Sequence, residues 1–282
     1  MAMAQFMTLF TAFQALLPQH LLSRAIGLLA FLQHPAWLKT LLIKGFMWSY
    51  GISLEEAQIK DPAAFDHFNH FFTRALEADA RPLATSRWVS PADGALSQRG
   101  NIESGAMVQA KGRWFDTQSL LAGTEEEAAA FESGAFATVY LSPRDYHRVH
   151  MPVAGQLQWT RYVPGDLFAV NQSTANGVNN LFARNERLVC YFSTEEGPVV
   201  LVLVGAIIVA GIETVWGGIE SPAPKAIRNQ VWENGQGPTF AAGDEIGRFF
   251  LGSTVVMLSS QRDISWAVEA GAPIKVNAAL AY

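Results

Sequence analysis

The sequence predicts an α+β fold in which N-terminal amphipathic helices precede a β-rich domain. Residues 5–50 are rich in leucine, phenylalanine and alanine, and their apolar positions recur at helical spacing. After residue 80, glycine, valine and short alternating runs dominate, separated by turn sequences such as "PADG", "PVAG" and "ENGQGP". We therefore expect a helical region at residues 1–76 and a β-rich domain at residues 77–282.

The N-terminal region is expected to form several short helices. Pro18 and Pro35 interrupt it, because proline ends or kinks a helix. The segment between them is predicted to have an apolar face made of Leu21, Leu22, Ala25, Leu28, Leu29 and Leu32. A further helix is predicted over residues 55–76, where Ser53 and Glu56 have the spacing of a capping box.

The charge of this region bears on membrane binding. No apolar run in it reaches about 18 residues, so no transmembrane helix is predicted, and the start "MAMAQ" lacks the basic segment of a secretory signal. Arg24, Lys39 and Lys44 precede the first acidic residue, Glu55, so residues 1–54 carry +3 in a chain of net charge −5. Such helices either pack on the protein's own core or lie in a membrane interface with basic residues toward lipid phosphates. The residues alone leave both interpretations open.

The β-rich region contains three features of note. One helix is expected around residues 117–131, "TQSLLAGTEEEAAAF". The apolar run at 199–211 is too short to span a membrane and favours two buried strands or one long strand. The single cysteine, Cys190, excludes an internal disulfide and is expected to be a buried, unreactive thiol.

The negative net charge of the whole chain argues against nucleic acid as the main partner.

A strand-like stretch near the C-terminus, "FFLGSTVV", is interrupted by Gly252, Ser253 and Thr254. One reading is structural, since glycine inside a strand often marks a bulge or a close backbone approach. The other is chemical, since a serine becomes a nucleophile when a histidine takes its proton and a carboxylate orients that histidine.

Two histidines are the candidate bases. His147 and His150 lie together in "SPRDYHRVHMPVAG", whereas the other four lie in the apolar N-terminal segments. A spacing of three places their rings on opposite faces of a strand, and no cysteine cluster or His-Glu motif accompanies them, so no metal site is predicted. Asp93 in "SPADG" and Asp145 are both candidate carboxylates, and spacing does not decide between them.

Six motifs together resemble the phosphatidylserine decarboxylase proenzymes, in their bacterial and mitochondrial branch. They are "SPADG", "YHRVHMPVAG", "YVPGDLFAVN", "NLFARNERLV", "VGAIIVAGIETVW" and "GRFFLGST". The resemblance runs from about residue 45 to 260, and Leu-Gly-Ser-Thr is the self-cleavage signature of that family. The N-terminal segment matches in character alone.

The resemblance implies self-cleavage between Gly252 and Ser253. Ser253 would attack the Gly252 carbonyl to form an ester, and β-elimination would then give dehydroalanine. Hydrolysis would release ammonia and leave a pyruvoyl group in place of Ser253. His150 resembles the family's base for this step and Asp93 its orienting partner. The products would be a β chain of residues 1–252 and an α chain of residues 253–282.

The resemblance also implies the reaction of the mature enzyme. The pyruvoyl group, a covalent cofactor derived from Ser253, would form a Schiff base with the amine of phosphatidylserine and accept the electrons released with CO2. His147 resembles the proton donor, and the product is phosphatidylethanolamine. No metal is implied.

This carboxy-lyase of phospholipid biosynthesis would act peripherally on the cytoplasmic side of the cell membrane. Its partners would be phosphatidylserine and an anionic lipid surface, and its two chains would stay together as a heterodimer, with a dimer of heterodimers as a further option. A lipid substrate favours interfacial N-terminal helices over core packing. Two alternatives are a serine hydrolase using Asp93, His150 and Ser253, and a non-catalytic membrane-binding module.

Overall fold

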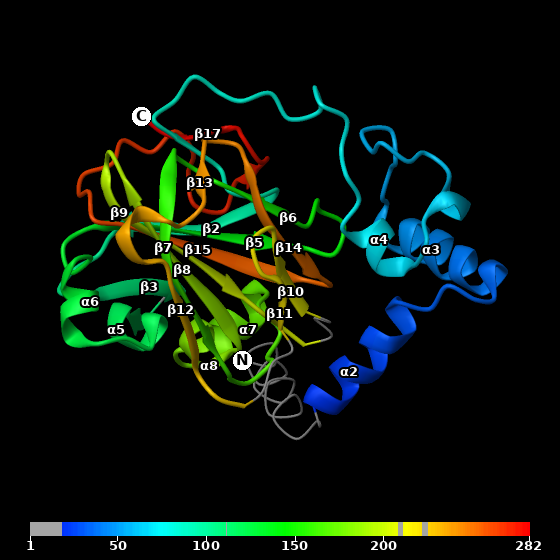
Figure 1. The fold of residues 1–282 in the computed structure, drawn as a ribbon, viewed down its shortest axis with the longest axis horizontal. Helices are drawn as coiled ribbons and strands as arrows, with labels where there is room; N and C mark the ends of the chain where they lie inside the picture. The colour runs from blue at the N-terminus through cyan, green and yellow to red at the C-terminus, as the bar shows by residue number, and fades with distance from the viewer. Residues whose placement is uncertain (1–18, 111, 208–210, 222–224) are drawn as a thin grey trace.

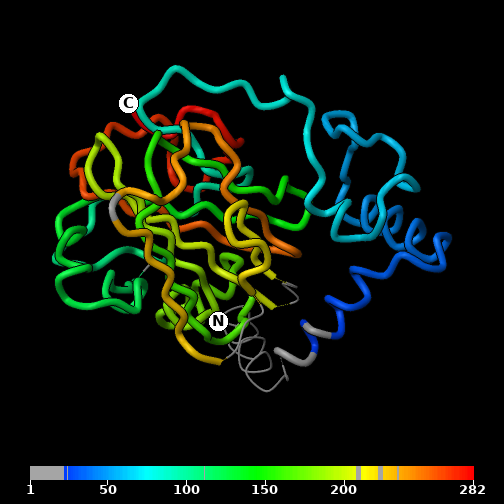
Figure 2. Tube along the Cα trace, in the orientation of Figure 1, coloured from blue at the N-terminus to red at the C-terminus, as the bar shows by residue number. Residues whose placement is uncertain are grey.

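The computed structural model describes residues 19–110, 112–207, 211–221 and 225–282 (Figure 1). It confirms the predicted α+β class, with N-terminal helices preceding a β-rich domain. The helices α2, α3 and α4 gather at one side of the β-sheets, as the chain trace also shows (Figure 2). Among the described residues, no helix is both long and apolar enough to cross a membrane.

The N-terminal helices differ in part from the prediction. Helix α2 spans Gln19–Ala30 and α3 spans Ala36–Tyr50, so the predicted break at Pro35 is confirmed, whereas Pro18 lies outside the described residues. Gly51 ends α3 in the left-handed conformation (φ 64°), and its N–H donates to the Met47 carbonyl.

The predicted helix over residues 55–76 is wrong. That segment holds only the 3₁₀ turn η1 (Pro62–Ala64) and the short helix α4 (Phe68–Phe72). The Ser53 hydroxyl accepts from the Glu55 N–H at 3.1 Å, so it closes a local turn instead of capping a helix.

The larger sheet has nine strands, and all of its neighbouring strands are antiparallel. Its order is β12-β7-β8-β9-β15-β5-β2-β16, and β13 also pairs with β7. The strands are β2 (Gly94–Asn101), β5 (Ala135–Leu141), β7 (Gly155–Val163), β8 (Arg187–Thr194), β9 (Gly197–Val204), β12 (Arg228–Val231), β13 (Thr239–Phe240), β15 (Ser253–Ser259) and β16 (Pro273–Ile274). Strand β15 lies between β9 and β5, and all seven of its residues are buried.

A second sheet of four strands has the order β11-β10-β14-β6. Its strands are β6 (Arg148–His150), β10 (Gly211–Thr214), β11 (Gly218–Ser221) and β14 (Glu245–Phe250). Two small pairs complete the domain, β1 (Trp88–Val89) with β17 (Ala279–Ala281) and β3 (Ala106–Ala110) with β4 (Arg113–Asp116). The chain passes from β14 to β15, and so from one sheet to the other, through only Leu251 and Gly252.

The alternation of side chains along β15 builds two separate apolar cores. Val255 and Met257 join one cluster with the second sheet, and Val256 and Leu258 join another on the opposite face. The second cluster includes residues of α5 (Thr117–Leu121), α7 (Gln172–Gly177) and α8 (Leu181–Arg184). Strand β15 is therefore fixed from both faces and along both edges.

Three further predictions can be compared with this fold. The helix expected around 117–131 is two short helices, α5 and α6 (Glu125–Ala129), with Gly123 between them. The run at 199–211 is split, because β9 ends at Val204 and β10 begins at Gly211. Cys190 lies fully buried in β8 as predicted, and burial raises the pKa of its thiol.

Candidate active site

The two residues before Ser253 both have left-handed backbone angles. Leu251 has φ 73° and Gly252 has φ 66°. This conformation costs an ordinary residue such as Leu251 about 1–2 kcal/mol, and Leu251 is held there by a cluster that includes Ala30 and Phe72. An added Cβ at Gly252 would meet no atom within 4 Å, so it is the backbone angle and not crowding that favours glycine.

Ser253 begins β15 with a buried and unused hydroxyl. Its backbone pairs with Leu141 of β5, and the ladder to β9 starts only at Thr254. The Ser253 Oγ has no hydrogen-bond partner among the described residues. A buried hydroxyl without a partner costs about 1–3 kcal/mol, and a catalytic role is one of the reasons for which a protein keeps such a group.

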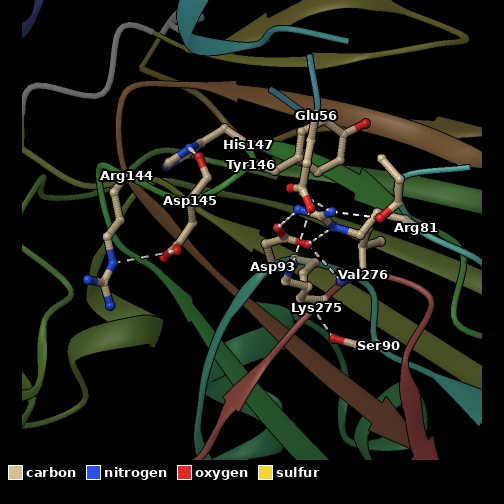
Figure 3. A network of polar contacts seen from close by, with 12 residues as sticks. Glu56, Arg81, Ser90, Asp93, Arg144, Asp145, Tyr146, His147, Lys275 and Val276 are labelled. Atoms are coloured by element: carbon tan, nitrogen blue, oxygen red, sulfur yellow. Dashed lines mark hydrogen bonds and ion pairs between the residues drawn. The ribbon is translucent and has the colours of Figure 1, made fainter. Parts of the chain in front are cut away.

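His147 is fully buried beside this turn. Its ring lies on Phe72, with ring centroids 4.0 Å apart, and its carbonyl accepts from the Phe249 N–H at 3.0 Å. The Asp145 carbonyl lies 2.8 Å from Nδ1, and because a carbonyl can only accept, Nδ1 carries the proton (Figure 3). Nε2 is therefore a lone-pair acceptor, and it has no partner among the described residues. Burial lowers the pKa of His147 to about 3, so the ring is neutral at pH 7.

His150 is held in the same tautomer by different partners. Its Nδ1 lies 2.7 Å from the Gly243 carbonyl, and its Nε2 lies 3.1 Å from the Tyr146 hydroxyl. Nδ1 therefore donates, and Nε2 accepts from Tyr146. Burial lowers the pKa of His150 and raises that of Tyr146. Both histidines thus offer neutral imidazoles whose Nε2 can accept a proton.

Strand β14 links the two histidines to the turn. Gly243, just before this strand, and Glu245 at its start lie against His150. Phe249, near its end, lies against His147. The strand then leads to Leu251 and Ser253. One strand of the smaller sheet therefore brings together the motif that holds both histidines and the C-terminal motif that holds Ser253.

Asp93 is clamped by Arg81 (Figure 3). Arg81 donates from Nε to Oδ1 at 3.0 Å and from Nη2 to Oδ2 at 2.6 Å, and the Val276 N–H donates to Oδ1 at 2.8 Å. Arg81 also pairs with Glu56 at 2.9 Å. Asp145, the rival carboxylate, accepts instead from the amide and hydroxyl of Ser142, both at 2.7 Å.

The predicted site residues are therefore only partly in contact. No hydrogen bond joins Asp93 to His150, or either histidine to the Ser253 Oγ, among the described residues. The negative charge of Asp93 does act on His150, whose pKa it raises against the larger effect of burial. No group of three or more metal-ligating side chains occurs in the described ranges.

A family model described as phosphatidylserine decarboxylase matches residues 68–282. The chain belongs to the phosphatidylserine decarboxylase family. A second model, described as PSD, matches residues 9–51. The chain is 53% identical to the phosphatidylserine decarboxylase proenzyme of Alcanivorax borkumensis, over 96% of this chain and 95% of that protein. It is also 53% identical to the proenzyme of Azotobacter vinelandii (92% and 91% covered) and 50% identical to that of Pseudomonas aeruginosa PAO1 (97% and 96%).

Sequence reasoning missed several residues of this candidate site. Tyr146 stands inside the motif that holds both histidines, so its place was a usable signal. Arg81 and Arg74 gave none, because isolated arginines outside a motif are usually solvated. Asn69 on α4 is fully buried, and neither atom of its side-chain amide has a partner among the described residues.

The low pKa of His147 predicts an acid-dependent loss of stability. The pKa of a histidine is ordinarily 6.5 and here about 3, so below pH 6.5 the unfolded chain binds a proton that the folded chain refuses. The free energy of unfolding should therefore fall as the pH drops from 6.5, by about 2 kcal/mol at pH 5, and should be insensitive to this group above 6.5. Urea unfolding of Ser253→Ala protein at about pH 7.5 and about pH 5 measures this fall.

The control is the same protein with His147→Gln added. It should lose less stability between the two pH values, whereas the contribution of His150 stays in both proteins. Equal losses in the two proteins would contradict the prediction.

Proposed function

We propose that this chain is a self-processing, pyruvoyl-dependent decarboxylase that converts phosphatidylserine to phosphatidylethanolamine and CO2. One observation carries the proposal. The Ser253 hydroxyl is buried with no hydrogen-bond partner in the part of the chain that the structure describes, and it directly follows two residues with left-handed backbone angles at the turn between the two sheets. Membership of the family supplies the reaction class.

The cleavage step needs a base near Ser253. His150 Nε2 accepts a hydrogen bond from the Tyr146 hydroxyl, and this bond must be given up before Nε2 can take the proton of Ser253. Removal of the hydroxyl proton lets Oγ bond to the Gly252 carbonyl carbon, and the peptide C–N bond then breaks as its nitrogen takes up the proton. The side of Gly252 where a Cβ would stand is open, which supports access to this bond.

The surroundings of Ser253 fit a group that must be shielded from water. Residue 253 is fully buried at the start of a strand that is fixed along both edges from Thr254 onward. A pyruvoyl group there supplies an electrophilic carbonyl that binds an amine and accepts electrons as CO2 leaves.

His147 acts on protons in this scheme. Its Nε2 carries none at rest, because Nδ1–H already donates to the Asp145 carbonyl. It must therefore take up a proton before it can give one to carbon after CO2 has left, and because burial lowers its pKa, that protonated form would exist only in passing.

Two measurements test the proposal. Intact mass spectrometry should find residues 1–252 and 253–282 as separate chains, and carboxyl-labelled phosphatidylserine should release labelled CO2. An intact chain with esterase activity would instead favour the serine hydrolase. An intact chain that binds lipid without turnover would favour the membrane-binding module.

The outer face of the N-terminal helices supports a peripheral place at the membrane. On α2, Ser23, Gly27 and Ala30 are buried, whereas Leu28 is 77% and Leu29 58% exposed. This is the reverse of a helix that packs its apolar side on a core. Exposed apolar residues on α3 continue the surface: Trp37, Leu41, Leu42, Trp48 and Tyr50.

An apolar pocket of about 610 Å³ connects this surface to the cleavage turn. Its lining comes from α2, α3 and α4 together with Leu251, two residues before Ser253. We propose that the protein lies on the cytoplasmic side of the membrane with this face in the lipid, so that acyl chains stay in the bilayer.

The expected role of the basic residues requires a correction. Lys39 is buried, and its ammonium donates to the carbonyls of Ala63, at 2.8 Å, and Phe65. It therefore does not face lipid phosphates, while Lys44 is exposed. The electrostatic part of membrane binding should be smaller than a charge of +3 implies, and apolar insertion correspondingly larger.

Replacing the exposed tryptophans should separate membrane binding from catalysis. Trp37 and Trp48 are 68% and 87% exposed, so Trp37→Ser with Trp48→Ser removes insertion area without opening the core. Each buried aromatic contributes about 1.5–3 kcal/mol, so liposome partitioning should weaken by at least about tenfold. Sedimentation with anionic vesicles measures it, and turnover of a short-chain soluble phosphatidylserine should stay unchanged.

The matched control is Trp114→Ser, at a 53%-exposed tryptophan on β4, which contacts β3, α5 and α8. It should leave vesicle binding intact. Equal weakening by the control, or unchanged binding in the double variant, would return these helices to a packing role alone.

A further inference from the structure

Arg74 is a buried guanidinium with unused hydrogen-bonding capacity. It lies two residues after the end of α4 and is only 6% exposed. Nη2 donates to the Arg144 carbonyl at 3.3 Å, and Nη1 has no partner among the described residues. Its Cζ lies 5.7 Å from the centre of the Phe71 ring. Because a buried cation without a paired anion costs several kcal/mol, this arrangement is typical of a site completed by an anionic ligand.

The guanidinium lies beside the proposed catalytic centre. Its charge lowers the pKa of His147, and Asp93 and Asp145 are close enough to act on the pKa of Arg74. Neither carboxylate is available to it, since Asp93 is held by Arg81 and Asp145 by Ser142. Phe72, two residues earlier, lies against both His147 and Leu251. The unused donor therefore belongs to the chain segment that packs on His147 and on the turn before Ser253.

We propose that Arg74 binds the phosphodiester of the substrate head group, an inference that rests on the proposed function. The head group carries two anions, a carboxylate and a phosphodiester. The carboxylate leaves as neutral CO2, so a cation bound to it would stabilise the bound substrate more than the transition state. The phosphodiester keeps its charge throughout, and its two non-bridging oxygens match the planar fork of a guanidinium. Arg74 is thus a binding residue that positions the amine and carboxylate for reaction.

A pair of substrates isolates the phosphate. Dihexanoyl phosphatidylserine carries it, and O-hexyl-serine presents the same amine and carboxylate without it. The parent enzyme should prefer the first in kcat/KM by at least about 100-fold. In Arg74→Met, kcat/KM should fall about 100-fold for the phosphate-bearing substrate. For the substrate without phosphate, it should stay within about threefold of the parent value. Arg74→Lys should fall between, because it keeps the charge without the fork.

The control is Arg144→Met, which removes an exposed guanidinium next to the same site. It should stay within about threefold on both substrates. Three outcomes would overturn the proposal. They are an equal fall of kcat/KM for both substrates in Arg74→Met, an equal effect of Arg144→Met, and a parent enzyme that shows no preference between the two substrates. The last outcome is measured on the parent enzyme alone, so the proposal can still be refuted if Arg74→Met does not fold.

A binding measurement tests the site without turnover. Calorimetry should show that Arg74→Met weakens dihexanoyl phosphatidylethanolamine by about 100-fold and leaves O-hexyl-ethanolamine unchanged. Inorganic phosphate should compete with the first ligand in the parent and not in the variant, and competition in both would place the anion elsewhere. If the parent decarboxylates neither substrate, the proposed function fails, while these binding ratios still decide the role of Arg74.

Discussion

Ser253→Ala should remain one chain of 282 residues, whereas the parent protein should separate into two. The smaller fragment would hold 30 of the 282 residues of a 30.8-kDa chain, roughly 3.3 kDa. Alanine lacks the oxygen that must bond to the Gly252 carbonyl, so the loss of cleavage should be complete. Intact mass spectrometry measures it, and the parent's small fragment should resist Edman degradation because a pyruvoyl group has no amine.

Substitution at the neighbouring residue provides the control. Thr254 also has a buried hydroxyl without a partner among the described residues, and Thr254→Val keeps its shape while removing the oxygen. It should still cleave. A parent protein that stays whole and nevertheless decarboxylates phosphatidylserine would refute the mechanism.

The two histidines should fail at different steps. His150→Ala should slow cleavage by at least about a thousandfold, because it removes the proposed base. His147→Ala should cleave at least in part and then decarboxylate poorly, because its Nε2 is proposed to move protons only in the mature enzyme. Denaturing gels over time give the first rate, and CO2 release per cleaved chain gives the second. Normal cleavage in His150→Ala with none in His147→Ala would reverse the assignment.

Asp93→Asn should also block cleavage, since it removes the charge that opposes the effect of burial on His150 and loosens the Arg81 clamp. Glu56→Gln is the matched control, because Glu56 is the other carboxylate on Arg81 and is half exposed. It should cleave normally. If both variants fail alike, the requirement is for the Arg81 network and not for the carboxylate at position 93.

The parts of this site that could be predicted are those written as local motifs. Ser253 interrupts an apolar strand, and the two histidines stand three residues apart, so both signals lie within short stretches. The Arg81 clamp and the Val276 amide could not be predicted, because they reach Asp93 from residues 12 and 183 positions away in sequence. The helix predicted over 55–76 failed for a related reason. Its phenylalanines are at helical spacing, but Phe65, Phe71 and Phe72 are buried by packing on α3 and His147 while the chain between them turns.

The position of β15 has a consequence for whether the protein can refold after it has been cleaved. The proposed small fragment would supply the strand between β9 and β5, with β16 and β17 pairing to β2 and β1. An uncut precursor folds as one molecule, but two separated chains would have to find each other in solution, and the stability of the pair would depend on protein concentration. Denaturation of the mature form should then be a one-way event with a measurable lifetime, whereas Ser253→Ala refolds after dilution. After cleavage, the two chains would thus keep the fold that the precursor reached but would not regain it once they were denatured and separated.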